Sequence, residues 1–337
     1  MKKPHSKFAF LGGMREDYCI THEDIVICDV LGGNAVYSAV GARIWVSPVS
    51  LVSRIGINFP REWIKDLQEA GIITGGVKIL DDIQNTCTFF AYLSPDDRVD
   101  TNPPSHFHRV NHPLPKALID YQSSTDGQES RNKFGPLAIR PSDLPQTISN
   151  TIAVHLAPAD YLSHATIPQT LRDSGVQIIT LDPSIRYMDP TFRRDLPTIV
   201  HGLDAFIPSV QEARAYFTAQ KMDVWEMAEV FGGMGARFVI IKRGPGGQCL
   251  WDKNAKQRWQ IPAYPAQVRD ATGAGDSFCG GFIVGLSQTG DPVEAALRGS
   301  VSASLTIEGS GALFALGAAP GLKEARLEYL RGGVKRI

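Results

Sequence analysis

The chain has 337 residues, of which 43% are hydrophobic and 20% are charged, a balance that is ordinary for a globular protein. Its formal net charge of −1 excludes the strongly basic surface of a nucleic-acid-binding protein or of one that lies on an anionic membrane. No window is apolar for long enough to span a membrane, and the five cysteines show no CxxC spacing. We therefore expect a cytoplasmic protein with free thiols.

The first apolar run, at residues 8–13, predicts a strand that is buried on both faces. Similar runs follow at 151–158, 176–184, 205–209 and 237–244. Such runs, separated by helical segments, are typical of βαβ units on a parallel sheet.

An alternating segment at residues 86–93 interrupts this pattern. Cys87, Phe89 and Leu93 share one apolar face, which predicts an antiparallel strand that serves as a lid or an oligomer interface. The polar segment that follows, at 101–141, predicts a loop. Its three histidines predict solvated side chains rather than a metal site, and they are His106, His108 and His112.

A helix is predicted over residues 291–309. Asp291 suits its N-cap, and Glu294 occupies the third position of a capping box. In the preceding helical run, the pair Gly280–Gly281 costs up to about 1 kcal/mol per glycine relative to alanine. Close packing or the approach of a ligand would explain that cost.

The stretch RDATGAGDSFCGGFIVGL places three small residues and an acid at the start of this earlier helical run. The N–H groups at a helix N-terminus attract anions, and glycine lets a phosphate approach the backbone closely. Gly273, Ala274 and Gly275 therefore predict an anion-binding site. Asp276 is either an acid favoured by the helix dipole or a general base beside the phosphate, and local physics leaves both interpretations open.

The segment DATGAGDSFCGGF resembles the C-terminal signature of the ribokinase family, also called the pfkB carbohydrate kinase family. Further stretches resemble family features in the right order, and they are LGGNAVYSAVGARI at 31–44, LDPSIR at 181–186, SVQEA at 209–213 and IKRGPGGQCL at 241–250. The resemblance implies a three-layer α/β/α sandwich with a mostly parallel sheet. It also implies a single domain over 1–337, with lid elements within about 13–45 and 76–112.

The resemblance implies a kinase that phosphorylates a sugar hydroxymethyl group with ATP and Mg²⁺. Asp276 would be the base, and the N–H groups of Gly273, Ala274 and Gly275 would form the anion hole. Glu212 would position Mg²⁺ through water, although Ser209 and Glu212 also fit a capping box. The positions implied for the nucleotide are Lys242, Gly244, Gly247, Thr272 and Gly311. Lys242 could equally be a strand-end lysine. Asp270 matches the region where some members bind a monovalent cation such as K⁺.

On the acceptor side, the resemblance places Asp17, Gly33 and Asn34 toward the sugar. Two residues depart from the family pattern, because Arg15 and Tyr37 stand where asparagine is usual. Arg15 could bind a carboxylate or phosphate on the acceptor, and Tyr37 could stack on a base or a sugar ring. Either residue could instead belong to lid packing.

Three alternatives to a sugar kinase follow from these residues. The first is a nucleoside kinase on the same fold, and the second is a sugar-binding regulator without catalysis, which would have no need of Asp276. The third, a nucleotide-binding oxidoreductase, fails because no GxGxxG follows the first strand. The partner is therefore expected to be a small sugar or nucleoside, with a homodimer formed through the lid.

Overall fold

The computed structural model describes residues 6–94, 97–218 and 220–337. Within them, a large sheet has the strand order β14-β13-β12-β11-β10-β9-β8-β1-β4-β5. The strands are β1 (Phe8–Leu11), β4 (Val49–Ile55), β5 (Ile72–Ile79), β8 (Ala153–Leu156), β9 (Ile178–Leu181), β10 (Ala205–Phe206), β11 (Phe238–Lys242), β12 (Gln248–Asp252), β13 (Gln257–Ile261) and β14 (Lys335–Arg336). Pairing is parallel from β5 to β11 and antiparallel from β11 to β14.

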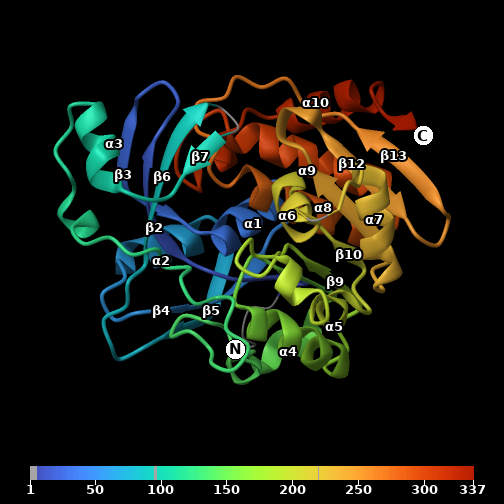
Figure 1. Ribbon diagram of the computed structural model, residues 1–337, viewed down its shortest axis with the longest axis horizontal. Helices are drawn as coiled ribbons and strands as arrows, with labels where there is room; N and C mark the ends of the chain where they lie inside the picture. Colours follow the sequence, from blue (N-terminus) through green and yellow to red (C-terminus); the bar gives the residue numbers. More distant parts are fainter. Residues whose placement is uncertain (1–5, 95–96, 219) are drawn as a thin grey trace.

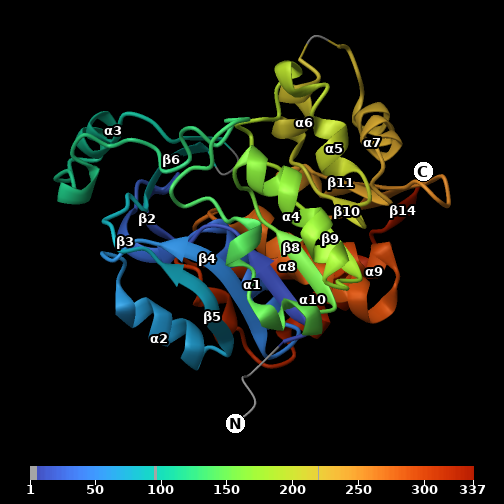
Figure 2. The ribbon, with the colours of Figure 1, turned by 90° about the horizontal axis from the view of Figure 1, so that it is seen from below.

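Helices cover both faces of this sheet (Figures 1 and 2). One face carries α1 (Asn34–Arg43), α2 (Arg61–Glu69), α8 (Ala274–Thr289), α9 (Pro292–Thr306) and α10 (Leu322–Arg331). The opposite face carries α4 (Tyr161–Asp173), α5 (Leu196–Val200), α6 (Val210–Tyr216) and α7 (Val224–Gly233). The predicted three-layer α/β/α class is therefore confirmed, and the five apolar runs are the adjacent strands β1, β8, β9, β10 and β11.

Close helix packing explains the glycine pair in α8. A Cβ built on Gly280 would lie 1.9 Å from the carbonyl oxygen of Ser38 in α1. A Cβ built on Gly281 would lie 2.6 Å from the carbonyl oxygen of Arg298 in α9. Both glycines are therefore required because α8 is pressed between two neighbouring helices.

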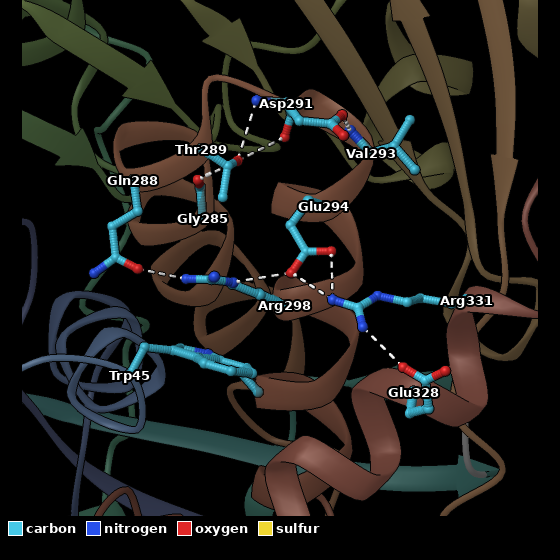
Figure 3. A network of polar contacts seen from close by, with 11 residues as sticks. Trp45, Gly285, Gln288, Thr289, Asp291, Val293, Glu294, Arg298, Glu328 and Arg331 are labelled. Carbon is cyan, nitrogen blue, oxygen red and sulfur yellow. Dashed lines mark hydrogen bonds and ion pairs between the residues drawn. The ribbon is translucent and has the colours of Figure 1, made fainter.

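Helix α9 confirms the predicted N-cap, since the side chain of Asp291 accepts a hydrogen bond from Val293 N at 2.8 Å. The capping-box role of Glu294 was wrong. Its carboxylate instead accepts from Arg298 at 3.4 Å and from Arg331 of α10 at 3.2 Å, as Figure 3 shows. Glu294 therefore ties α9 to α10 rather than capping its own helix.

A second, smaller sheet stands at one end of the molecule (Figure 1). Its order is β3-β2-β6-β7, with β2 (Arg15–Ile20), β3 (Val26–Gly32), β6 (Cys87–Ser94) and β7 (Asp97–Val99). These strands fall within the ranges expected for the lid. The alternating strand is β6, and it pairs antiparallel with β7 but parallel with β2.

The apolar face of this lid is covered by the chain itself. Phe89 is fully buried, and its ring centroid lies 5.8 Å from that of Phe107 and 6.2 Å from that of Tyr121. Phe107 belongs to α3 (Pro103–Arg109), a helix that the prediction of a loop over 101–141 missed. Leu93, by contrast, is exposed. The apolar face therefore gives no support to a second subunit, and a dimer stays a prediction.

Two of the three histidines of this region contact aromatic rings, whereas His108 and His112 are exposed, as predicted for solvated side chains. His106 lies against Phe89, and His112 lies against Phe107 with Nδ1 2.8 Å from the carbonyl oxygen of Pro113. No cluster of three or more metal-ligating side chains occurs in the described part of the chain. None of the helices described there is long and apolar enough to cross a bilayer.

Candidate active site

The candidate site lies at the carboxyl ends of the parallel strands, where α8 begins. Gly273 is the N-cap of α8 and has φ 74°. A Cβ built on it would lie 2.1 Å from the ring of Tyr37, so both its conformation and its space require glycine. Tyr37 is therefore packed beneath the anion hole, where one face of its ring is occupied by Gly273.

The first turn of α8 offers backbone donors to an anion. Ala274 N is 3.3 Å from the carbonyl oxygen of Ala271. Within residues 6–94, 97–218 and 220–337, the N–H groups of Gly273 and Gly275 have no hydrogen-bond partner. Two of the three predicted donors are thus free, at the positive end of a helix of 16 residues.

Asp276 stands in the same turn and is half-buried. Burial raises the pKa of its carboxyl group to about 6, against the opposing effect of the positive charges of Lys242 and Arg98. A carboxylate with a pKa this close to neutrality can accept a proton more readily than an exposed aspartate can. The raised pKa is compatible with the predicted role of Asp276 as a base, which stays a prediction.

Lys242 ends β11 and forms a buried ion pair with Asp182, which follows β9. Only 13% of the lysine side chain and 3% of the aspartate side chain are exposed. Although burial acts against its charge, the carboxylate of Asp182 raises the pKa of Lys242. A Cβ built on Gly275 would lie 3.3 Å from the lysine Nζ, so the pair stands directly behind the anion hole.

Asp182 was not predicted as a site residue. The available signal was an acid placed immediately after a buried strand, in the stretch LDPSIR. Its Oδ2 contacts Lys242, while no partner for its buried Oδ1 is present among the described residues.

Glu212 occupies the first turn of α6, and the capping box with Ser209 is formed. Both the N–H and the hydroxyl of Ser209 donate to Glu212 Oε2, at 2.6 and 2.8 Å. The negative charge of Glu212 also acts to raise the pKa of Asp182 and of Asp276, which places it near both. The residue therefore caps a helix and lies near the two aspartates, and its role in positioning Mg²⁺ stays a prediction.

On the acceptor side, Asp17 and Arg15 are buried at the base of the lid, 3% and 8% exposed. Burial raises the pKa of Asp17 to about 6, although the hydroxyl of Thr88 donates to its Oδ1 at 2.5 Å. Burial lowers the pKa of Arg15, against the opposing charges of Asp17 and Asp160. Within the described chain Arg15 forms no ion pair, and its Nη1 donates to the Met14 carbonyl at 3.0 Å.

Gly33 and Asn34 shape the junction between lid and sheet. Gly33 has φ 98°, and a Cβ built on it would lie 2.5 Å from the Gly13 carbonyl oxygen. The amide of Asn34 accepts from Gly13 N at 2.7 Å and donates to the Pro158 carbonyl at 2.5 Å. Both residues are therefore fixed by the fold, and their role toward the acceptor stays a prediction.

The predicted nucleotide glycines divide into two kinds. Gly244 has φ 53° and Gly311 has φ 82°, and a Cβ on either would meet no described atom within 4 Å. Gly247 has φ 73°, and its Cβ would lie 2.1 Å from the Ile261 carbonyl oxygen. The turn between β11 and β12 thus requires glycine at 247 because of close packing. At Gly244 and Gly311, by contrast, the space that a side chain would occupy is open.

Asp270 and Thr272 face the lid. Asp270 Oδ1 accepts from Thr272 N at 2.9 Å, and the Thr272 hydroxyl shares a hydrogen bond of 3.1 Å with the Tyr92 hydroxyl of β6. The segment just before the anion hole is therefore linked to the lid. This contact joins residues 180 positions apart, and sequence alone gives no sign of it.

Known proteins resemble this chain both in sequence and in fold. The family model described as "pfkB family carbohydrate kinase" matches residues 148–318. A cytidine kinase from Thermococcus kodakarensis is 28% identical over 269 residues, which cover 79% of this chain and 84% of that protein. A ribokinase II structure from E. coli, in complex with ATP and Mg²⁺, has a TM-score of 0.69 at 17% identity and covers 96% of this chain and 99% of its own.

A second structure with the same fold is the aminoimidazole riboside kinase from Salmonella enterica, in complex with aminoimidazole riboside and an ATP analogue. Its TM-score is 0.68 at 15% identity, with 96% of this chain and 100% of that chain covered. Because the sequence identities are only 17% and 15%, these two structures show that the fold is shared and nothing more.

Proposed function

The chain belongs to the pfkB family of carbohydrate kinases, and we propose that it transfers the γ-phosphoryl group of ATP to a hydroxymethyl group of a sugar. The observation that supports this proposal is the first turn of α8. It combines free N–H groups at Gly273 and Gly275 with a carboxylate, Asp276, whose pKa is raised to about 6. A regulator that only bound sugar would have no use for that carboxylate.

In the proposed reaction, an acceptor hydroxyl oxygen forms a bond to the γ-phosphorus while the bond to the bridging oxygen of ADP breaks. Asp276 takes the proton of that hydroxyl. The N–H groups of Gly273 and Gly275 donate to the phosphoryl oxygens, which carry the developing charge. Glu212 would hold Mg²⁺ through water, and the ion would neutralise phosphate charge.

The proposed binding regions lie on either side of this turn. Arg15, Asp17, Gly33 and Asn34 would meet the acceptor, because they line the base of the lid. The nucleotide would lie along the open glycines Gly244 and Gly311. Lys242 and Thr272 would support the anion hole from behind and from the lid side, rather than lie along the nucleotide. Tyr37 would support Gly273.

A nucleoside is the second candidate acceptor. The observation that favours it is the identity with a cytidine kinase, which extends over 79% of this chain. A panel of sugars and nucleosides, assayed for ADP release with ATP and Mg²⁺, separates the two. Release with no member of the panel would contradict the proposal.

The Asp276→Asn variant tests the proposed base. It should lower kcat by about 10²–10⁴-fold with little change in ATP affinity, because the backbone donors remain. Asp291→Asn is the matched control, since it makes the same change at the start of α9, outside the site. A variant that keeps more than about a tenth of wild-type kcat would show that Asp276 is only a helix-start acid.

Three finer expectations remain proposals. K⁺ dependence, with Asp270 and the Thr272 carbonyl as candidate ligands, is tested by comparing rates in K⁺ and Na⁺. A lid-mediated dimer is tested by small-angle scattering with and without substrates. A cytoplasmic location accords with the five free cysteines.

A further inference from the structure

Two positive side chains act on Asp276 from opposite sides of the site. The positive charges of Lys242 and Arg98 both act to lower its pKa. Lys242 comes from the main sheet, and Arg98 comes from β7 of the lid. The site is otherwise acidic, because Glu212 and Asp17 act in the opposite direction.

Lys242 has little net charge to offer a substrate. Its ammonium is held by Asp182, and both side chains are buried behind the backbone of Gly275. An ion pair of this kind presents a dipole rather than a free cation. A γ-phosphoryl group that approached the free N–H groups would therefore still lack a charged partner on the protein.

Arg98 differs from Lys242 both in its exposure and in its lack of an ion-pair partner among the described residues. It is exposed, and it forms no ion pair with any residue in 6–94, 97–218 or 220–337. Its guanidinium carbon lies 4.2 Å from the centroid of the Phe90 ring, a cation–π contact that orients the group without neutralising it. Its Nη1 also approaches the Tyr92 hydroxyl at 3.4 Å.

Tyr92 connects this arginine to the anion hole. Its hydroxyl shares a hydrogen bond of 3.1 Å with Thr272, the residue directly before Gly273. The lid thus holds Arg98 two hydrogen bonds from the start of α8. Guanidinium groups suit phosphate because their planar N–H groups can donate in pairs.

We propose that Arg98 is a catalytic residue that donates from the lid to the transferring γ-phosphoryl group. The inference rests on the proposed function and adds a residue to it. Phe90 and Tyr92 orient the guanidinium, and Lys242 is excluded from the same task by Asp182. The lid then completes the charge of the anion hole as well as covering the acceptor.

The test compares Arg98→Gln and Arg98→Lys with a matched control, Arg237→Gln. Arg237 is also exposed and lies 4.5 Å from the ring centroid of its neighbour Phe238, outside the site. With the best acceptor, Arg98→Gln should lower kcat by about 10²–10³-fold, in the range for loss of one donor to a developing charge. Arg98→Lys should recover part of this loss, and Arg237→Gln should lose none.

The pH profile adds a readout that a structural role would not move. Removal of a positive charge near Asp276 raises the pKa of that carboxyl group, so the acid limb of kcat should move to higher pH in Arg98→Gln. An unchanged kcat, or a rise in the acceptor KM alone, would overturn the proposal and assign Arg98 to acceptor binding or to packing.

A binding measurement keeps the proposal testable without any acceptor. A non-hydrolysable ATP analogue and ADP are titrated calorimetrically in Mg²⁺ buffer. Arg98→Gln should weaken binding of the analogue about tenfold and leave ADP unchanged, because only the analogue has a γ-phosphoryl group. Equal affinities for wild type and variant would overturn the Arg98 role. Wild-type inactivity with the whole acceptor panel would instead contradict the proposed function.

Discussion

Replacement of Lys242 by methionine should destabilise the fold in a manner that depends on pH. The substitution keeps the length of the side chain and removes the ammonium that pairs with Asp182. Because 97% of the Asp182 side chain is buried, the carboxylate left behind cannot be solvated and takes up a proton instead.

The magnitude follows from the cost of that proton. An unfolded aspartate has a pKa of about 3.9, and each unit between this value and the solution pH costs about 1.4 kcal/mol. With the carboxyl protonated in the folded variant, the loss in unfolding free energy is about 4 kcal/mol at pH 7 and about 1.5 kcal/mol at pH 5. In the variant, the pKa of the Asp182 carboxyl group is higher in the folded state than in the unfolded state. The variant therefore keeps its stability near pH 4 and loses it as the pH rises.

Urea denaturation at pH 5 and pH 7 measures this difference. Arg331→Met is the matched control, because its ion pairs with Glu294 and Glu328 are partly exposed (Figure 3), and its loss should cost about 1 kcal/mol or less at either pH. A double variant, Asp182→Leu with Lys242→Met, should recover most of the stability. A loss for Lys242→Met below about 1 kcal/mol at pH 7, with no dependence on pH, would refute the reasoning.

Three further predictions concern the site. Since Asp276 must be ionised to act as a base and its pKa is about 6, kcat should fall about tenfold per unit below that pH, and a flat profile down to pH 5 would contradict its role. Arg15→Asn should raise KM for an anionic acceptor about 10–100-fold while KM for ATP stays within about twofold, whereas equal effects on neutral and anionic acceptors would exclude charge recognition. Gly273→Ala should lower the melting temperature and kcat more than Gly311→Ala, because both have positive φ but only Gly273 is pressed against Tyr37, and equal losses would contradict this packing.

Local sequence determined the elements and the nature of the chemistry. Apolar runs predicted the parallel strands, because a strand covered on both faces has no polar side to display. The TGAG run before an apolar helix predicted the start of α8, because its small residues and the acid that follows suit an anion-binding helix terminus. The fold class and the family could therefore be recognised from residues close together in the chain.

Contacts between distant segments were decided only in the tertiary structure. Asp182 and Lys242 are 60 positions apart, and their pairing depends on the strand order β9-β10-β11. Glu294 also shows that sequence alone cannot choose between a local contact and a distant one. Its carboxylate could form either a capping box in α9 or an ion pair with Arg331, and the docking of α10 against α9 favours the ion pair.

The lid shows the limit most clearly. An alternating strand at 86–93 specifies two unlike faces, but the sequence does not say what covers each face. The fold places α3 against Phe89, and it brings Tyr92 to Thr272 on the other side. Sequence patterns fix which side chains share a surface, because that follows from the backbone period. Only the tertiary structure decides what each surface meets, because that depends on how distant segments pack.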